Sequence, residues 1–345
     1  YFEPELRQEG TDQVLTMRLK TSEKAYIEFI YRLPHNDYML GFDILTHGLE
    51  DVVEFDRPIV LDWSLKGYRQ AKSISYENRY TRLTYSYDGG NEFDKLGPLG
   101  NDNAEEQGVT WINFRQHFFS SMLLSDSPFE SVDLFSEDLV DDEAIDTVFT
   151  KSYLAKIRLS PDRNRLDHRM NLYFGPTDYG VFKSYDKNLD EAMPLGWGIF
   201  GWINKFIIFP VFGALSQWFP AGIAIILLTV FFKLLLSPVQ YKQYVSQAKL
   251  KVLKPELDEI RKKHEGNQMK IQQETMKLQN TAGASPLKGC LPALLQIPVF
   301  YALFTFFPTA FGLRQKSFLW ADDLSSHDVI IELPVNIPFY GDHVS

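Results

Sequence analysis

One cationic side chain, Lys233, lies inside a long apolar run and is the residue of this chain best placed to do chemistry. It is the only charged residue from Phe206 to Leu236. A charge at the centre of a membrane-spanning helix costs about 2.5–3.5 kcal/mol on insertion scales, so intramembrane lysines generally mark functional sites. The chemistry open to such a charge is electrostatic, because in a low-dielectric surrounding it attracts acidic groups strongly.

The neighbours of Lys233 form a polar stripe along one helix face. Thr229, Lys233, Ser237 and Gln240 are 4, 4 and 3 residues apart, a spacing that places them on the same side of a helix. A polar stripe of this kind should face a water-filled cavity or other protein rather than lipid. The alternative is that Lys233, about 12 Å along the helix from Tyr241, extends its ammonium toward the membrane surface.

Two apolar segments could hold this stripe in a membrane. Residues 218–240 are predicted to form one transmembrane helix, since Trp218–Leu236 is long enough to cross the hydrocarbon core. Residues 289–312 are uncharged and are predicted to form a second one, in which Gln296 is the most polar side chain. The prolines of the second segment indicate a bent helix that packs within a bundle.

Residues 196–217 are predicted to form a helix that lies in the membrane interface, because the stretch is rich in tryptophan and phenylalanine. The alternative is one long tilted span that continues through Phe219–Pro220. Gly196 to Gly201 match the glycine spacing of a dinucleotide loop, but no predicted strand precedes them and no acidic ribose ligand follows. We therefore expect no cofactor. The histidines lack metal-ligand spacing, so no metal site is expected.

Residues 241–288 contain ten basic and five acidic residues and are predicted to form a helical hairpin. Pro255 should kink its first arm or mark a helix boundary. Six cations form a candidate docking surface for a partner or for anionic headgroups: Lys249, Lys251, Lys254, Arg261, Lys262 and Lys263. The hairpin could equally be a solvated connection between the two spans.

Residues 1–192 are predicted to form a β-sandwich domain. Short strand-like segments, for example Val14–Lys20, Ala25–Leu33 and Arg79–Tyr87, are separated by turn residues. Residues 1–195 contain 21 basic and 35 acidic residues, which argues against binding to nucleic acid. The chain has a single cysteine, so no disulfide can form within it.

The charge distribution predicts an orientation in the membrane. Basic loops stay in the cytoplasm, which places residues 241–288 there and residues 1–192 and 313–345 on the opposite side. Two spans make a poor bundle, and no export signal precedes the first domain. We therefore expect further spans in a longer parent protein.

The segment from Ser285 to Pro292 (SPLKGCLP), with Gln296–Phe300 (QIPVF) after it, resembles the signature of the YidC/Oxa/Alb family of membrane-protein insertases. Trp111–Leu123 and Tyr173–Pro176 resemble motifs in the periplasmic domain of the Gram-negative branch. The order of the predicted segments fits the same family. The resemblance covers essentially the whole chain, and residues 285–300 are its most specific part.

The resemblance implies a multi-domain α+β protein of the bacterial inner membrane. A periplasmic, supersandwich-like β-sandwich would precede an α-helical membrane domain with a cytoplasmic hairpin. Thr229 and Lys233 align with the threonine and the cation of the family's hydrophilic groove, where arginine is usual; lysine keeps the charge but loses the bidentate geometry. The implied function is insertion of nascent membrane proteins, without enzymatic chemistry. The implied partners are these nascent chains, the Sec translocon, the ribosome and membrane lipids.

Two other functions fit parts of the sequence. A transporter or channel fragment could use Lys233 to bind a small anion. A membrane-anchored periplasmic module could bind glycans through the β-sandwich alone, although no paired acid and base residues indicate an enzyme.

Overall fold

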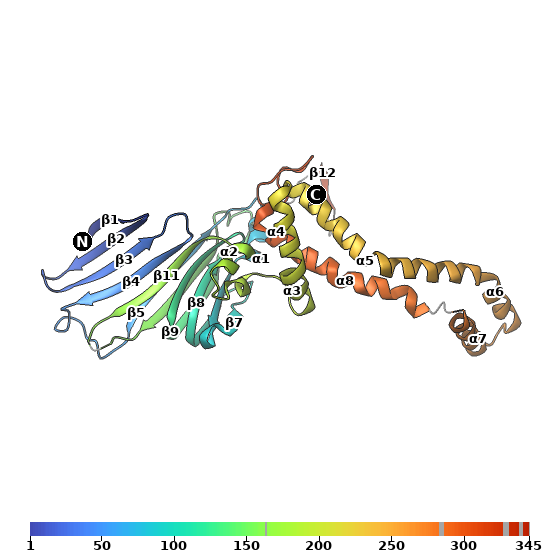
Figure 1. Cartoon of the computed structure of the whole chain (residues 1–345), viewed down its shortest axis with the longest axis horizontal. Coiled ribbons are helices and arrows are strands. Elements are labelled where there is room, and N and C mark those ends of the chain that lie inside the picture. Colours follow the sequence, from blue (N-terminus) through green and yellow to red (C-terminus); the bar gives the residue numbers. More distant parts are fainter. Residues whose placement is uncertain (163, 283–285, 327–330, 338–340, 345) are drawn as a thin grey trace. The chain divides into compact units, whose positions relative to one another are not determined.

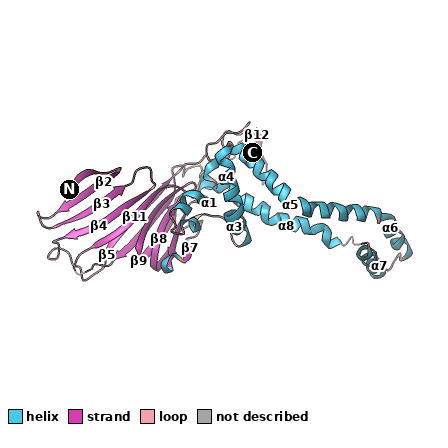
Figure 2. Cartoon of the chain, in the orientation of Figure 1, coloured by secondary structure: helices cyan, strands magenta, loops and turns pink. Residues whose placement is uncertain are grey.

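The structure is a computed structural model of residues 1–345, and it describes all of them except 163, 283–285, 327–330, 338–340 and 345. The chain divides into two compact units, Tyr1–Pro194 and Leu195–Ser345. Figure 2 shows that the first unit is built mainly from strands and the second mainly from helices. We call them the β domain and the helical domain. This composition confirms the predicted α+β fold class.

The described residues of the β domain form eleven antiparallel strands and four short helical segments. The strands are β1 (Glu3–Glu9), β2 (Asp12–Lys20), β3 (Tyr26–Leu33), β4 (Met39–His47), β5 (Ile59–Tyr68), β6 (Arg82–Tyr87), β7 (Glu92–Lys95), β8 (Asp102–Arg115), β9 (Phe119–Asp138), β10 (Phe149–Leu159) and β11 (Asp167–Pro176). The helical segments are α1 (Ile74–Tyr80), α2 (Tyr179–Ser184) and the 3₁₀ turn η2 (Leu189–Ala192). A further 3₁₀ turn, η1 (Asp88–Gly90), joins β6 to β7.

The long strand β9 is the point where the sheet forks. One edge of β9 pairs with β8 over almost its whole length, with a register shift between Val109 and Trp111 on β8. On its other edge, the first half of β9 pairs with β11 and the second half with β10. One branch continues from β11 through β4, β3 and β2 to β1, and the other ends at β5. Because β9 pairs with both branches, one continuous hydrogen-bonded sheet forms two layers that face each other.

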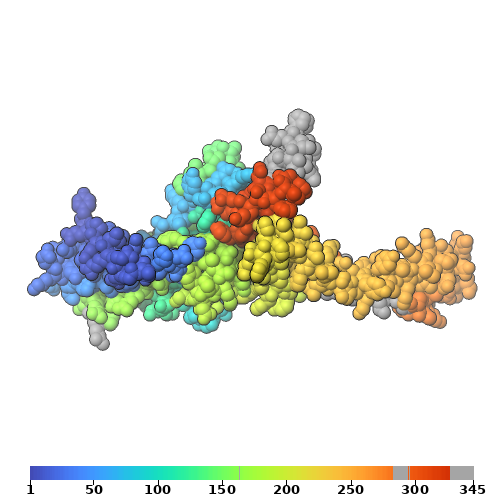
Figure 3. Space-filling model, turned by 45° about the horizontal axis from the view of Figure 1, so that its top comes forward, coloured from blue at the N-terminus to red at the C-terminus, as the bar shows by residue number. Residues whose placement is uncertain are grey.

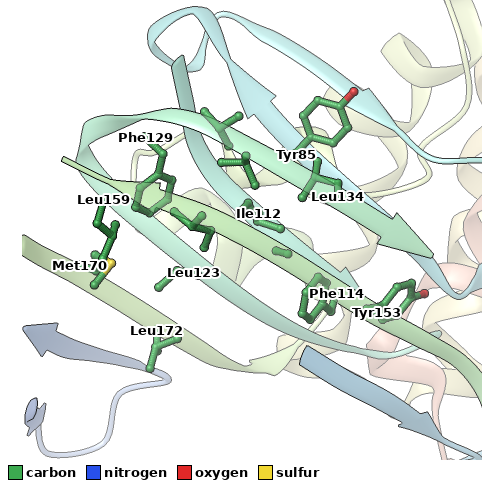
Figure 4. Packing of buried hydrophobic residues seen from close by; sticks show 14 of the residues in the cluster. Tyr85, Ile112, Phe114, Leu123, Phe129, Leu134, Tyr153, Leu159, Met170 and Leu172 are labelled. Carbon is green, nitrogen blue, oxygen red and sulfur yellow. The ribbon is translucent and has the colours of Figure 1, made fainter. Parts of the chain in front are cut away.

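The core of the β domain lies between these layers, and Figure 4 shows part of its packed hydrophobic cluster. Phe114 of β8 is fully buried, with its ring 4.1 Å from that of Trp63 on β5 and 5.1 Å from that of Tyr153 on β10. Leu172 of β11 belongs to the same cluster, so both branches contribute to it. The strand pleat explains this placement, since alternate residues of each strand point to the same face.

The helical domain contains α3 (Ile199–Ile203), α4 (Phe209–Trp218), α5 (Ala221–Val252), α6 (Lys254–Lys263), α7 (Gln268–Thr281), α8 (Pro286–Thr309), the 3₁₀ turn η4 (Phe311–Leu313) and the strands β12 (Ile331–Ile337) and β13 (Gly341–Val344). The π-helical turn η3 (Asn204–Ile208) joins α3 to α4 without interruption. Ile199–Trp218 and Ala221–Val252 are both long and apolar enough to cross a membrane. The interfacial position of the first helix therefore stays a prediction.

The chain breaks its helix between the two candidate spans. Phe219 has extended backbone angles, and α5 begins after Pro220, so a single span that runs through both segments is not formed. A tight turn precedes the first helix, where Gly196 and Gly198 have positive φ angles. A Cβ on Gly201 would collide with the carbonyl oxygen of Gly196. These glycines therefore serve the turn into α3, in a segment that no strand directly precedes.

Helix α5 extends well beyond the predicted span 218–240, and Figure 1 shows that it bends partway along its length. Pro238 lies in its interior and has no N–H to donate to the carbonyl of Leu234, a common cause of such bends. The hydroxyl of Ser237 donates a 2.8 Å hydrogen bond to that same carbonyl oxygen. The carbonyl oxygen of Leu234, which Pro238 leaves without a backbone donor, therefore still accepts a hydrogen bond from within the helix.

Some sequence-based boundaries were wrong. The strand predicted for Arg79–Tyr87 begins only at Arg82, because Arg79 and Tyr80 end helix α1, whose first turn is capped by Ser73. The hairpin predicted for 241–288 has no separate first arm at Tyr241, since α5 runs on to Val252. Its arms are α6 and α7, and Pro255 lies at the start of α6 as a boundary residue. Figures 1 and 3 show both helices beyond the end of α5 that lies away from α3 and α4.

Candidate functional site

A groove of about 340 Å³ lies between α5 and α8. Its polar lining residues are Thr229, Lys233, Gln240 and Gln296, from both helices. The rest of the lining is apolar: Phe232, Leu236, Val299, Phe300, Leu303, Phe304 and Phe307. The groove therefore presents a short row of polar groups, including one cation, within a hydrophobic surface.

Lys233 lines this groove with its side chain exposed, and it forms no ion pair with any residue in the described part of the chain. An unpaired ammonium beside aromatic and aliphatic side chains can attract a carboxylate, because the apolar surroundings screen the charge less than water does. Thr229, one turn earlier, donates its hydroxyl hydrogen to the carbonyl of Ile225 at 2.9 Å. Its oxygen can still accept a hydrogen bond from a ligand.

Ser237 is not among the residues that line the groove, although the sequence placed it on the same stripe. Its hydroxyl is bonded to the Leu234 carbonyl beside Pro238. At 3.6 residues per turn, two steps of four residues from Thr229 turn Ser237 about 80° away from it around the helix axis, whereas Leu236 stays within about 20° of Thr229 and lines the groove. The structure therefore brings together four of the five stripe and groove residues that the sequence proposed.

The apolar wall that α8 contributes to the groove was not predicted from the sequence. Counted from Gln296, the other wall residues lie 3, 4, 7, 8 and 11 positions further along the chain, the pattern of a single helix face: Val299, Phe300, Leu303, Phe304 and Phe307. The pattern starts at Gln296, which the sequence had already indicated as the most polar side chain of this segment. Gln296 also lines a second hollow, of about 510 Å³, with Ile297, Phe300, Tyr301 and Phe304. Gln296 thus lies where the two hollows of α8 meet.

A buried amide fixes the π-helical turn against α8. Asn204 is fully buried, and its Nδ2 donates to the carbonyl of Leu195 at 2.7 Å and to the hydroxyl of Thr305 at 2.8 Å. Phe209 and Phe212 of α4 pack edge-on against Phe306 of α8. The helix that forms one wall of the groove is therefore supported from behind by α3 and α4.

The six hairpin cations are all exposed. Lys249 and Lys251 lie in the last turn of α5, Lys254 begins α6, and Arg261, Lys262 and Lys263 lie in the last turn of α6. Cations in a last helical turn also interact favourably with the helix dipole, which is a structural reason for their positions. Arg261 forms a 3.7 Å ion pair with Asp258, and the hairpin is joined internally by His264 and Glu274 at 3.2 Å.

The fold and the groove together define a class: a membrane protein with a large β domain and a helical domain in which a polar, cationic groove opens between apolar helices. The periplasmic-domain model of the YidC family matches residues 2–210, and the model described as "60Kd inner membrane protein" matches residues 207–340. The chain belongs to the YidC family.

Relatives named membrane protein insertase YidC match almost the whole chain. The relative from Bacteroides fragilis is 39% identical over 97% of this chain, and that from Porphyromonas gingivalis is 37% identical over 100%. The relative from Amoebophilus asiaticus is 36% identical over 93%. The chain spans about half of these proteins, 54 to 57% of their lengths. Among solved structures, heparinase III overlaps with 50% of this chain and 21% of its own at a TM-score of 0.24 and 8% identity, from which nothing is argued.

Proposed function

We propose that this chain is part of a membrane-protein insertase, and that the groove between α5 and α8 receives a nascent hydrophobic segment together with its polar flank. The observation that carries the proposal is the lining of the groove. One cation and three polar side chains lie within an aromatic and aliphatic wall, in a chain whose relatives are named insertases. A site of this composition suits a ligand that is mostly apolar and carries an acidic or polar group.

The mechanism would be non-covalent, so the chain would not act as an enzyme. Lys233 would attract an acidic residue of the substrate, while Thr229, Gln240 and Gln296 offer hydrogen bonds to backbone groups that lose water. The apolar wall of α8 would contact the hydrophobic part of the segment. Release into lipid would be driven by burial of apolar surface, at about 25 cal/mol per Å². No nucleotide or other cofactor is needed for these steps.

We further propose the topology that the charges indicate. Residues 1–192 and 313–345 would lie in the periplasm, with 218–240 and 289–312 as inner-membrane spans and 241–288 in the cytoplasm. The length of α5 supports this, because its 32 residues measure about 48 Å, more than the roughly 30 Å of the hydrocarbon core. The end of α5 and the hairpin would then stand in the cytoplasm. The exposed cations there would meet lipid headgroups or the ribosome, and the groove would work alone or beside the Sec translocon.

Site-specific photocrosslinking in the full-length protein tests the groove. A probe at Gln240, which lines it, should crosslink to ribosome-bound nascent membrane proteins only while the hydrophobic segment emerges. A matched probe at Ser237, which is exposed on the same helix but does not line the groove, should crosslink much less. Equal crosslinking at both positions would mean that substrate contacts α5 without entering the groove, and the proposal would fail.

Substitution of Lys233 tests the charge. Lys233→Glu should reduce insertion of a substrate with an acidic flank by about tenfold or more, because attraction becomes repulsion in a weakly screened site. Lys233→Arg should retain activity if only the charge matters. Protease protection of the substrate in membrane vesicles measures both, and the accumulated amount of each variant serves as control. Full activity of Lys233→Glu would show that the cation does not take part.

A further inference from the structure

The β domain has a polar face on the side of the β7–β6–β8 sheet opposite its hydrophobic core. In an antiparallel ladder, directly paired residues point to the same side. Arg82 pairs with Arg115, and Thr84 pairs with both Asn113 and Lys95. Leu83 and Phe114, which alternate with these residues, point into the core. Three cations and two neutral polar side chains therefore share one small area, which we call the cationic face.

The cations of this face have no carboxylate partner in the described part of the chain. Arg115 is buried, and its guanidinium donates to the main-chain carbonyls of Tyr80 and Ala192, at 3.2 and 2.6 Å. No ion pair forms at Arg82 or at the ammonium of Lys95 among the described residues. The neighbouring Lys151, by contrast, is neutralised by Asp138 at 3.2 Å. The cationic face thus holds positive charge that no ion pair among the described residues neutralises.

The cations also act on one another electrostatically. Burial, and next the charge of Arg82, lower the pKa of Arg115 to about 10. Partial loss of water around its ammonium, then Arg82 and Arg115, lower the pKa of Lys95 although the side chain as a whole is exposed, and the adjacent Asp94 acts in the opposite direction. Like charges this close are unfavourable unless an anion lies between them. A negatively charged ligand between the cations would relieve this repulsion.

The cationic face also contains polar groups that lack a hydrogen-bond partner in the described structure. Thr84 and Asn113 are fully buried, yet the hydroxyl of Thr84 and both amide atoms of Asn113 have no hydrogen-bond partner in the described structure, and neither has Nε of Arg82. Buried polar groups are normally paired, so these point to a missing partner. At the rim of this face Lys95 is exposed and Arg82 partly exposed, whereas Thr84 and Asn113 are enclosed.

We propose that the cationic face is a binding site for a phosphate-type oxyanion, either free or carried by a lipid headgroup. Arg82 and Lys95 would bind its charged oxygens from the rim, and Thr84 and Nδ2 of Asn113 would donate to it from the floor. Arg115 would add charge from below while it holds the ends of α1 and η2. Charge-assisted hydrogen bonds of this kind suit a ligand with several acceptor oxygens. The site lies in the β domain and does not depend on the insertion groove.

Isothermal titration of the full chain in a neutral detergent tests this site. Inorganic phosphate should give saturable heat at constant ionic strength. Lys95→Gln and Arg82→Gln should each raise the Kd about tenfold, because each removes a charged donor. Thr84→Val, which keeps the shape and the charge, should weaken binding less. Lys24→Gln, an exposed lysine without an ion pair among the described residues, is the matched control and should leave the Kd unchanged.

Glycerol 3-phosphate in place of inorganic phosphate identifies the source of the ligand. Tighter binding of glycerol 3-phosphate would point to a lipid headgroup, and tighter binding of phosphate to a free anion. Circular dichroism checks that each variant folds. If Arg82→Gln does not fold, the Kd of Lys95→Gln, a substitution at an exposed position, decides the test. Absence of saturable heat in the unaltered chain would overturn the proposal, since water alone would then satisfy the buried groups. Equal Kd values in the unaltered chain and in Lys95→Gln would also overturn it.

Discussion

The two domains place their large hydrophobic side chains in opposite ways. In the β domain, Phe114 and Tyr153 are almost completely enclosed, at 0 and 1% exposure. In the helical domain, Trp202, Phe206 and Leu234 are 54, 59 and 67% exposed. Thr229, Lys233 and Gln240 of α5 line the groove instead. One domain thus has the arrangement expected in water, and the other has the arrangement expected where lipid is the solvent.

This difference shows which forces stabilise each domain. The β domain gains stability from removal of apolar surface from water, so a hole in its core should be costly. The helical domain gains little from that effect within a bilayer and depends on close packing between helices and on satisfied backbone groups. The stability of the helical domain should therefore be most sensitive to substitution of small residues at contacts between helices, and less sensitive to substitution of large apolar residues.

The largest expected effect is in the β core. Phe114→Ala should destabilise the β domain by about 3–5 kcal/mol, because it leaves a cavity between Trp63 and Tyr153. Urea unfolding followed by the circular dichroism of the sheet measures the change. Phe174→Ala is the control, since its ring is 47% exposed, and should cost under about 1 kcal/mol. Equal effects at the two positions would contradict the description of the core.

A smaller effect is expected at a helix contact. A Cβ on Gly222 would collide with the ring of Phe318, which packs on the first turn of α5. Gly222→Ala should therefore cost about 1–3 kcal/mol, as overpacking does. Gly213 is the matched control, because nothing lies within 4 Å of the position its Cβ would take, and there alanine should stabilise helix α4 by about 0.5–1 kcal/mol. Thermal unfolding in detergent compares the two; a stabilising Gly222→Ala would show that Phe318 does not pack there.

Much of this arrangement could be predicted from the sequence, because its signals are local. Strand-like composition located fewer than half of the strands described in the β domain, among them β2 and β3, and the apolar runs located the long helices. The lone charge at Lys233 and its spacing from Thr229 and Gln240 selected three residues of the groove. Gln296 was selected only as the most polar residue of its segment. The family resemblance at residues 285–300 supplied the functional class.

The remainder depends on contacts that spacing does not encode. Ser237 lies outside the groove because two steps of four residues turn it about 80° from Thr229 around the helix axis, a drift that the spacing rule ignores. The strand predicted through Tyr80 is wrong because Tyr80 ends α1, where its ring stacks on His117, 37 residues further along the chain. The fork at β9 could not be foreseen either, because it needs one strand edge to serve two partners.

The smallest expected effect concerns pH and again separates core from surface. Burial, and next the charge of Asp94, raise the pKa of Tyr85 to about 12. Below pH 10 this phenol is protonated in both the folded and the unfolded chain, so it causes no pH dependence. Between about pH 10 and pH 12 the unfolded chain loses the proton and the folded chain keeps it, so stability falls as pH rises. Tyr85→Phe should reduce that slope by at most about 1.4 kcal/mol per pH unit.

Urea unfolding at a series of alkaline pH values measures the slope. Tyr68→Phe serves as the control, because Tyr68 is 57% exposed and its phenol meets water in both states. Other buried tyrosines contribute in the same direction, so the unaltered chain should retain part of the slope in the Tyr85 variant. Burial raises the pKa of Tyr173 in the same way. An unchanged slope in Tyr85→Phe would mean that its phenol reaches water in the folded domain. The contrast between enclosed large side chains in the β domain and exposed ones in the helical domain would then not apply to Tyr85 on β6.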